Sequence, residues 1–413
     1  MVKERRFAVN KAPIIRKADC ASNTKEMMIH FMIALIPIIV FGFVKNGLLP
    51  FINTVDVKDF AAVIDMLRPL ILVIVGGLTS FLAELVYFAL VKKSKTPVND
   101  ALNSYSLIPG LLIAVIVPLY TPVWVLVLGC LFGTVIGKLV FGGFSKNIFN
   151  PALIGYLFIQ TAFSGVVAAN GGALNPTEVD AIVSGATPLV GFKADMFGSY
   201  DALVKPYGSI LDFFLGNVPG ALGETSAVAC LLAFLYLAFR KVIDWKIPVI
   251  YVGGVFVLTY LLGAFNGHAA DLWYPAFGIF SGGLMFGAVF MATEPVTAPK
   301  TPNGRVLYAI SLAVLTVMFR YKSNFPEGVA SSILLMNMFV FIYDNIAAPL
   351  RVEQRKWKVA LVYGLFALVF LGIFAFVLFT TGKFAPAEAL MINNPLFNLG
   401  FGGLKWVKIK IVF

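Results

Sequence analysis

The chain has 413 residues, of which 59% are hydrophobic and 13% are charged. A soluble domain carries about a quarter charged residues, whereas apolar runs near the length needed to cross a bilayer recur along this whole chain. This excludes a soluble globular protein, and the lack of an alternating pattern excludes a membrane β-barrel. The net charge of +11 does not indicate a nucleic-acid partner, because basic residues normally flank membrane helices. The isolated Cys20, Cys130 and Cys230 are interpreted as packing residues.

The apolar segments predict an all-α polytopic membrane protein with about ten or eleven transmembrane helices. They lie at 27–44, 69–91, 104–118, 122–141, 149–167, 226–239, 247–264, 272–291, 306–319, 328–350 and 359–380. Two of them are short for a span, and Gly or Pro interrupts several, which is tolerated where freed backbone groups face protein or a cavity. The predicted organisation is a cytoplasmic arm at 1–26, a first five-helix repeat at 27–167, a loop at 168–225, a second five-helix repeat at 226–350, and an extra helix with a tail at 351–413.

The distribution of Lys and Arg predicts a cytoplasmic N-terminus. With this orientation most of the 32 basic residues fall on the inside, and none needs to lie in mid-membrane. The loop 168–225 then lies outside, and Lys193 and Lys205 are its only basic residues.

Proline spacing suggests that the two halves are related. The pair Pro118 and Pro122 has the same spacing as the pair Pro295 and Pro299, and each pair follows a Gly-containing helix. Five spans precede the long loop and at least five follow it. Because five is an odd number, the two halves would enter the membrane from opposite sides. The pattern predicts an inverted repeat, whose site usually lies where the halves meet. Coincidence is the alternative, because Pro is common at span ends.

Three acidic residues, Glu84, Glu294 and Asp344, lie in or against predicted spans. A carboxylate there is normally paired, hydrated or functional. Glu84 either reaches toward the basic Lys92 or serves as a cation or proton ligand. Asp344 either pairs with Arg351 or belongs to an ion path, and Glu294 either accepts local backbone hydrogen bonds or lines a cavity.

The segment FGGFSKNIFNPALIGYLF at 141–158 predicts a binding cleft. Gly142 and Gly143 would let another group approach the backbone, and Asn147 and Asn150 offer fixed amides. Planar cofactors or quinones favour apolar clefts with few polar groups. A glycine turn that merely packs helices remains the alternative.

The loop segment SGATPL at 184–189 places the hydroxyl of Thr187 after the small Gly185 and Ala186 and before Pro188. That arrangement suits a threonine that a modifying enzyme must reach. Taken alone, it is an ordinary loop.

With these residues assembled, the chain resembles the Rnf D subunit and Nqr B subunit family over about residues 12–350. The ordered elements of the resemblance are APIIR (12–16), Glu84, FGG with N-x-FNPA (141–152), SGATPL (184–189), MATEPVTAP (291–299), FPEGVA (325–330) and Tyr343-Asp344.

The resemblance implies that Thr187 carries FMN through a phosphoester bond made by a flavin transferase, with Ser184, Gly185 and Ala186 around it. The family has an acidic residue six positions before the acceptor, where this chain has Ala181. This difference bears on whether the transferase recognises the segment, and not on the chemistry of the acceptor hydroxyl.

Two further expectations rest on the resemblance. The acids Glu84, Glu294 and Asp344 become ion-path candidates, and the segment containing Gly142, Gly143, Asn147 and Asn150 borders a riboflavin site or, in Nqr, a quinone site. The residues expected to bind cofactor are therefore Thr187, Ser184, Gly185, Ala186, Gly142, Gly143, Asn147 and Asn150.

The resulting functional expectation is a flavoprotein subunit of a Na⁺- or H⁺-translocating ferredoxin:NAD⁺ oxidoreductase in the bacterial cytoplasmic (inner) membrane. Its partners would be other membrane subunits, including a second flavin subunit, together with the flavin transferase and membrane lipid. Oxidation of NADH or ferredoxin would belong to other subunits, since the sequence has no dinucleotide fingerprint and no iron–sulfur cysteine set. The short N-terminal arm favours Rnf over Nqr. The alternatives are an Nqr-type B subunit, a flavin-free secondary transporter or channel, and an assembly subunit without cofactor.

Overall fold

The computed structural model describes residues 24–51, 60–170, 173–174, 184–185, 188–224, 226–323, 328–350 and 356–382. Six of its helices are long and apolar enough to cross a membrane, and a helix pair bent by 64° supplies a seventh candidate span. Four shorter apolar helices accompany them. Together they account for each of the apolar segments found in the sequence, so the predicted all-α polytopic membrane fold is confirmed.

The first half begins with α1 (Thr24–Phe43), η1 (Val44–Leu48) and α2 (Leu49–Phe51), where η1, η2, η3 and η5 are π-helical turns. It continues with α3 (Phe60–Val86), η2 (Tyr87–Val91), α4 (Pro97–Asn103), α5 (Leu107–Ile116), α6 (Val123–Thr134), η3 (Val135–Leu139) and α7 (Pro151–Ala162). The connecting region contains α8 (Ser164–Ala169), β1 (Ala173–Leu174), β2 (Ser184–Gly185), α9 (Pro188–Ala194), α10 (Tyr200–Leu203), η4 (Lys205–Tyr207) and α11 (Ile210–Leu215). The second half contains α12 (Ala227–Phe239), α13 (Lys246–Asn266), α14 (Trp273–Phe280), α15 (Leu284–Phe286), η5 (Gly287–Met291), α16 (Pro302–Lys322) and α17 (Gly328–Leu350), followed by α18 (Lys356–Thr380).

The two halves pack their helices in the same pattern. In the first half α3 packs against α5 and α6, and α6 packs against α7. In the second half α13 packs against α14 and α16, and α16 packs against α17. Helices α1 and α12, which open the two halves, pack against each other. These relations fit an inverted repeat in which the opening helices join the halves.

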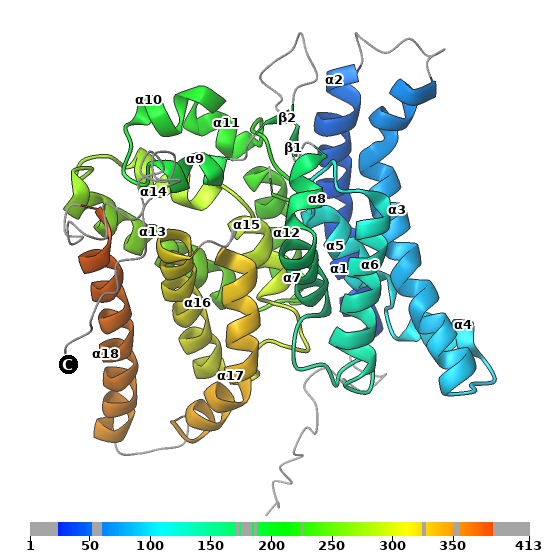
Figure 1. Ribbon diagram of the computed structural model, residues 1–413. Coiled ribbons are helices and arrows are strands. Elements are labelled where there is room, and N and C mark those ends of the chain that lie inside the picture. The colour runs from blue at the N-terminus through cyan, green and yellow to red at the C-terminus, as the bar shows by residue number, and fades with distance from the viewer. Residues whose placement is uncertain are drawn as a thin grey trace, which may run out of the picture.

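The bundle has two distinct ends (Figure 1). Helices α8 to α11 and the small β1–β2 pair gather at one end, at the top of the view, while α4, the end of α17 and the start of α18 lie at the other. Helix α18 stands at the edge of the bundle, where it packs against α16 and leaves most of its apolar surface uncovered.

The bend between α14 and α15 leaves backbone carbonyl groups without helical partners. The guanidinium of Arg320, on α16, donates to the carbonyl oxygens of Gly278 and Ser281. A buried cation thus replaces the lost backbone hydrogen bonds. Such replacement is required in a membrane protein, where a broken helix has no water to satisfy its free carbonyl groups. One predicted span, 272–291, is thus broken, and the compensating arginine comes from a distant helix.

The two cysteines in the described part of the chain, Cys130 and Cys230, are buried free thiols. This agrees with their interpretation as packing residues, and Cys20 lies outside the described residues.

Helices α3 and α5 approach so closely that their contact requires glycine. A methyl group on Gly110 would lie 1.9 Å from the carbonyl oxygen of Gly76, and one on Gly76 would lie 2.6 Å from the carbonyl oxygen of Gly110. Because both neighbours are backbone, neither helix can yield without separating from the other.

We predict that Gly110→Ala destabilises the protein by about 1–3 kcal/mol through overpacking, measured as a lower midpoint of thermal unfolding in detergent. The matched control is Gly364→Ala in α18, where nothing lies within 4 Å of the added methyl group. Equal midpoints for the two variants would contradict the close α3–α5 contact.

Candidate functional site

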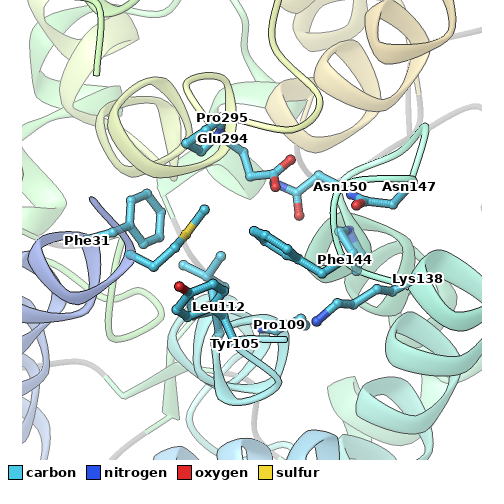
Figure 2. Close-up of a pocket in the computed structure, with 13 residues that line it drawn as sticks. Phe31, Tyr105, Pro109, Leu112, Lys138, Phe144, Asn147, Asn150, Glu294 and Pro295 are labelled. Carbon is cyan, nitrogen blue, oxygen red and sulfur yellow. The ribbon is translucent and has the colours of Figure 1, made fainter. Parts of the chain in front are cut away.

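A cavity lies where the two halves meet, with about 460 Å³ of free space when its opening to solvent is included (Figure 2). Its lining comes from α1, the start of α5, η3, the η3–α7 loop and the segment after η5. The lining residues are Met28, Phe31, Tyr105, Ile108, Pro109, Leu112, Lys138, Phe144, Asn147, Asn150, Pro151, Glu294 and Pro295. The cavity is therefore largely apolar, with two amides and two charged groups at fixed positions.

The η3–α7 loop turns the chain into the cavity wall. Gly142 and Gly143 have φ values of +107° and +92°, and Ser145 has φ +71°. The amide N–H of Gly143 donates to the carbonyl of Lys138 at 3.0 Å. The two glycines are not among the lining residues; they adopt the left-handed conformations that reverse the loop. The space beside Gly143 is open, since an added methyl group would meet nothing within 4 Å.

This loop delivers one aromatic ring and two amides to the cavity. The ring of Phe144 packs edge-on against Tyr105, with the ring centroids 5.1 Å apart. The side-chain amide of Asn147 donates to the carbonyl of Phe149 at 3.0 Å, which fixes its orientation. The sequence prediction that Asn147 and Asn150 present fixed amides agrees with this geometry.

Asn150 joins the two halves of the protein. Its side-chain oxygen accepts from the amide N–H of Ala152 at 3.0 Å and so caps α7, while its side-chain nitrogen donates to the carbonyl of Met291 at 3.4 Å. With the side-chain amide of Asn337, on α17, oriented so that its oxygen faces Asn150, that oxygen accepts from the backbone N–H of Asn150 at 3.1 Å. The contacts to Met291 and Asn337 both cross from the first half to the second.

A buried ion pair borders the cavity. The ammonium group of Lys138 lies 2.5 Å from Glu84 and donates to the carbonyl of Ser104 at 2.7 Å. The Glu84 side chain is fully buried and that of Lys138 is 4% exposed. The Lys138 ammonium also lies 5.8 Å from the centre of the Phe144 ring. A cation is therefore held at the cavity wall by an anion behind it.

This pair corrects one expectation. Glu84 does not reach toward Lys92, whose ammonium lies over the rings of Tyr87 and Phe88. Its partner is Lys138, which is buried inside the segment 122–141. Its position within that apolar segment was the signal that could have identified it.

Glu294 lines the cavity from the second half. One oxygen of its carboxylate accepts from the backbone N–H and the hydroxyl of Thr297, at 3.2 and 2.5 Å. In Figure 2 the carboxylate lies beside Asn150, while Lys138 enters the cavity from another side. Withdrawal from water raises the pKa of the Glu294 carboxyl, and the hydrogen bonds from Thr297 partly offset this.

Asp344 does not belong to this cavity. Its carboxylate accepts from the backbone N–H groups of Lys300 and Thr301 and from the Thr301 hydroxyl, at 2.7–3.0 Å. It thereby fastens α17 to the segment that precedes α16. Arg351, its predicted partner, lies outside the described residues.

The described parts of the SGATPL segment, β2 and the start of α9, lie at the end of the bundle that carries α10 and α11 (Figure 1). Ser184 and Gly185 form β2, which pairs with β1, and α9 begins at Pro188. Leu189 and Phe192 of α9 are buried, and the Phe192 ring lies 5.2 Å from that of Tyr321. Ala186 and Thr187 lie outside the described residues.

Comparison with known proteins agrees with this architecture. The D subunit of a ferredoxin:NAD⁺ oxidoreductase complex from Clostridium ljungdahlii, named as proton-translocating, is 31% identical over 86% of this chain and 98% of its own length. The D subunit of a Na⁺-translocating complex from Acetobacterium woodii is 36% identical over 65% of this chain and 78% of its own length. The B subunit of a Na⁺-translocating NADH-quinone reductase from Klebsiella pneumoniae is 33% identical over 68% of this chain and 66% of its own length.

These relatives are subunits of ion-translocating oxidoreductase complexes. The NQR2, RnfD, RnfE family matches residues 8–353, which include both halves of the bundle and the cavity between them. The chain therefore belongs to the NQR2, RnfD, RnfE family.

Proposed function

We propose that this chain is the membrane-embedded D subunit of an ion-translocating ferredoxin:NAD⁺ oxidoreductase of the Rnf type. The observation that carries the proposal is the match to the Clostridium D subunit, which covers 98% of that protein. The Nqr-type relative is matched over a smaller share of its length, 66%. Other membrane subunits, one of them with its own flavin, would complete the electron path.

The charge distribution supports a cytoplasmic position for the end that carries α4. Exposed lysines gather there in the turns next to α4 and α13, at positions 92, 93, 95 and 241. The region between the halves, which lies at the other end, contains the acids Asp195, Asp201 and Asp212. By the positive-inside rule, this distribution favours an extracytoplasmic SGATPL segment.

Thr187 is the proposed attachment point of FMN. Net condensation of the FMN phosphate with the Thr187 hydroxyl, with loss of water, would give a phosphoester. Thr187 directly precedes α9, whose Leu189 and Phe192 are buried in the bundle. An attached flavin would therefore be tethered next to an anchored helix, not to a long free loop.

In this proposal a second, non-covalent planar group such as riboflavin or a quinone would bind in the cavity. The rings of Phe31, Tyr105 and Phe144 supply apolar walls, Asn147 supplies a polar contact, and Lys138 supplies a cation. When bound, such a group accepts and donates electrons. The protein's own contribution is to hold it between apolar walls, with the Lys138 side chain kept in position by Glu84.

Ion coupling would arise where the halves meet. A redox-dependent charge in the cavity shifts the balance between two arrangements of the bundle only if it interacts differently with each. Lys138 and Glu294 both line the cavity, and they come from opposite halves. These two residues are therefore placed to respond to the same charge.

The covalent flavin is tested by mass and fluorescence. Full-length protein co-expressed with its flavin transferase should gain about 440 Da by ester condensation at one hydroxyl and should fluoresce in a denaturing gel. Thr187→Ala should lose both signals and Ser184→Ala should keep them. If wild type and Thr187→Ala give the same mass, the covalent assignment is wrong.

The non-covalent site is tested by the flavin or quinone that acid precipitation releases from the purified complex. Phe144→Ala removes one wall of the cavity and should lower the released riboflavin or quinone by about tenfold, equivalent to about 1.4 kcal/mol. Phe141→Ala is the matched control, because Phe141 is partly buried in the same loop, as Phe144 is, and is not among the lining residues. Equal loss in both variants would contradict the cavity as the site, while covalent flavin on Thr187 should persist in both.

The ion path is tested by following Na⁺-dependent and H⁺-dependent turnover in vesicles. Glu294→Gln should lower ion-coupled turnover by about tenfold, or about 1.4 kcal/mol in the barrier. Glu84→Gln leaves Lys138 buried without a counter-charge, at a cost of about 3–5 kcal/mol, so it is compared with Glu84→Gln/Lys138→Met. Restored stability without restored coupling would keep the Glu84–Lys138 pair in the path.

Asp344→Asn tests the remaining candidate, whose carboxylate fastens the start of α16. Unchanged coupling in the Glu84, Glu294 and Asp344 variants would remove all three from the ion path.

A further inference from the structure

A cationic cleft lies beside the cavity, and Pro295 lines both of them. The cleft is formed by the turn between α12 and α13 and by the segment before α16, and it encloses about 1150 Å³ that opens to solvent. The residues that give it its chemistry are Lys241, Lys246, Lys300, Arg305, Asp244 and Trp245. The cleft lies at the end of the bundle that carries α4, where α12 ends and where α13 and α16 begin.

The cleft carries more positive charge than its own acid can neutralise. Asp244 pairs with Arg305 at 2.6 Å and accepts from the backbone N–H of Lys246 at 3.0 Å. Arg305 also donates to the carbonyl of Pro299 at 2.9 Å. None of the three lysines forms a salt bridge with another residue in the described part of the chain. The cleft is therefore complementary to an anion.

The helices that border the cleft carry exposed apolar side chains. On α12, Leu232, Leu235 and Phe239 are 58%, 54% and 86% exposed, and their spacing places them on one helix face. Trp245, which lines the cleft, is 56% exposed, and tryptophan is enriched at the level of lipid headgroups. Val249 on α13 is 47% exposed.

From this arrangement we infer that the cleft binds the phosphate group of an anionic phospholipid, whose acyl chains lie along the exposed face of α12. Lysine ammonium groups bind a phosphate as point charges, and basic pockets between membrane helices on the cytoplasmic side suit anionic headgroups. The paired Arg305 and Asp244 fix the shape of the cleft and leave the three lysines for the ligand. This assignment is independent of the proposed redox function.

Native mass spectrometry of the full-length protein tests the inference, with phosphatidylglycerol titrated in an uncharged detergent. The wild type should retain one phosphatidylglycerol more tightly than phosphatidylcholine. The triple variant Lys241→Gln/Lys246→Gln/Lys300→Gln should bind phosphatidylglycerol roughly a hundredfold more weakly. Each basic residue near the headgroup contributes about fivefold in affinity, and three such contributions multiply to about a hundredfold. The corresponding Lys→Arg triple variant should retain binding, which separates charge from folding.

The matched control is Lys92→Gln/Lys93→Gln/Lys95→Gln, which removes the same charge from the same end of the bundle but outside the cleft. It should bind phosphatidylglycerol as the wild type does. If both triple glutamine variants bound phosphatidylglycerol equally weakly, the affinity would depend on the total surface charge, and the assignment of the cleft as the binding site would be wrong. Displacement of the lipid by millimolar inorganic phosphate, or equal retention of phosphatidylcholine, would also overturn the assignment to a lipid headgroup.

Discussion

The buried pair of Lys138 and Glu84 is the constraint on which the cavity depends. A charge withdrawn from water must be compensated inside the protein, and here the compensation joins α3, η3 and the carbonyl of Ser104 at the junction between α4 and α5. The same lysine faces the cavity. The position of a cation in the cavity wall is therefore set by an acid that does not line the cavity.

The spans and the interrupted helices could be predicted because hydropathy and the positions of Gly and Pro are local properties of the sequence. The partners of the charged residues could not. Sequence proximity suggested Lys92 for Glu84, whereas the structure brings Lys138 from 54 residues away. Arg320 satisfies the broken α14–α15 turn from a similar separation. Such pairings depend on which helices become neighbours, and a single sequence does not contain that information.

The candidate site also combines features that local sequence predicts with features that depend on how the helices pack. Asn147 and Asn150 were predicted as fixed amides from their place in the segment 141–158, which is a local property of the sequence. The bonds from Asn150 to Met291 and Asn337 depend on how the halves meet and were not predictable. Thr187 was singled out by resemblance, because its immediate sequence is that of an ordinary loop, and it lies outside the described residues.

The hydrogen bonds of Asn150 couple the position of one half of the bundle to that of the other. Asn150 caps α7, and α7 also supports the loop that carries Phe144 and Asn147. It also holds the carbonyl of Met291, three residues before Glu294. A movement of one half relative to the other would break or strain these bonds and would change the cavity wall and the surroundings of Glu294 together. Coupling requires such a shared element, because an electron and an ion influence each other only through a state whose stability both of them change.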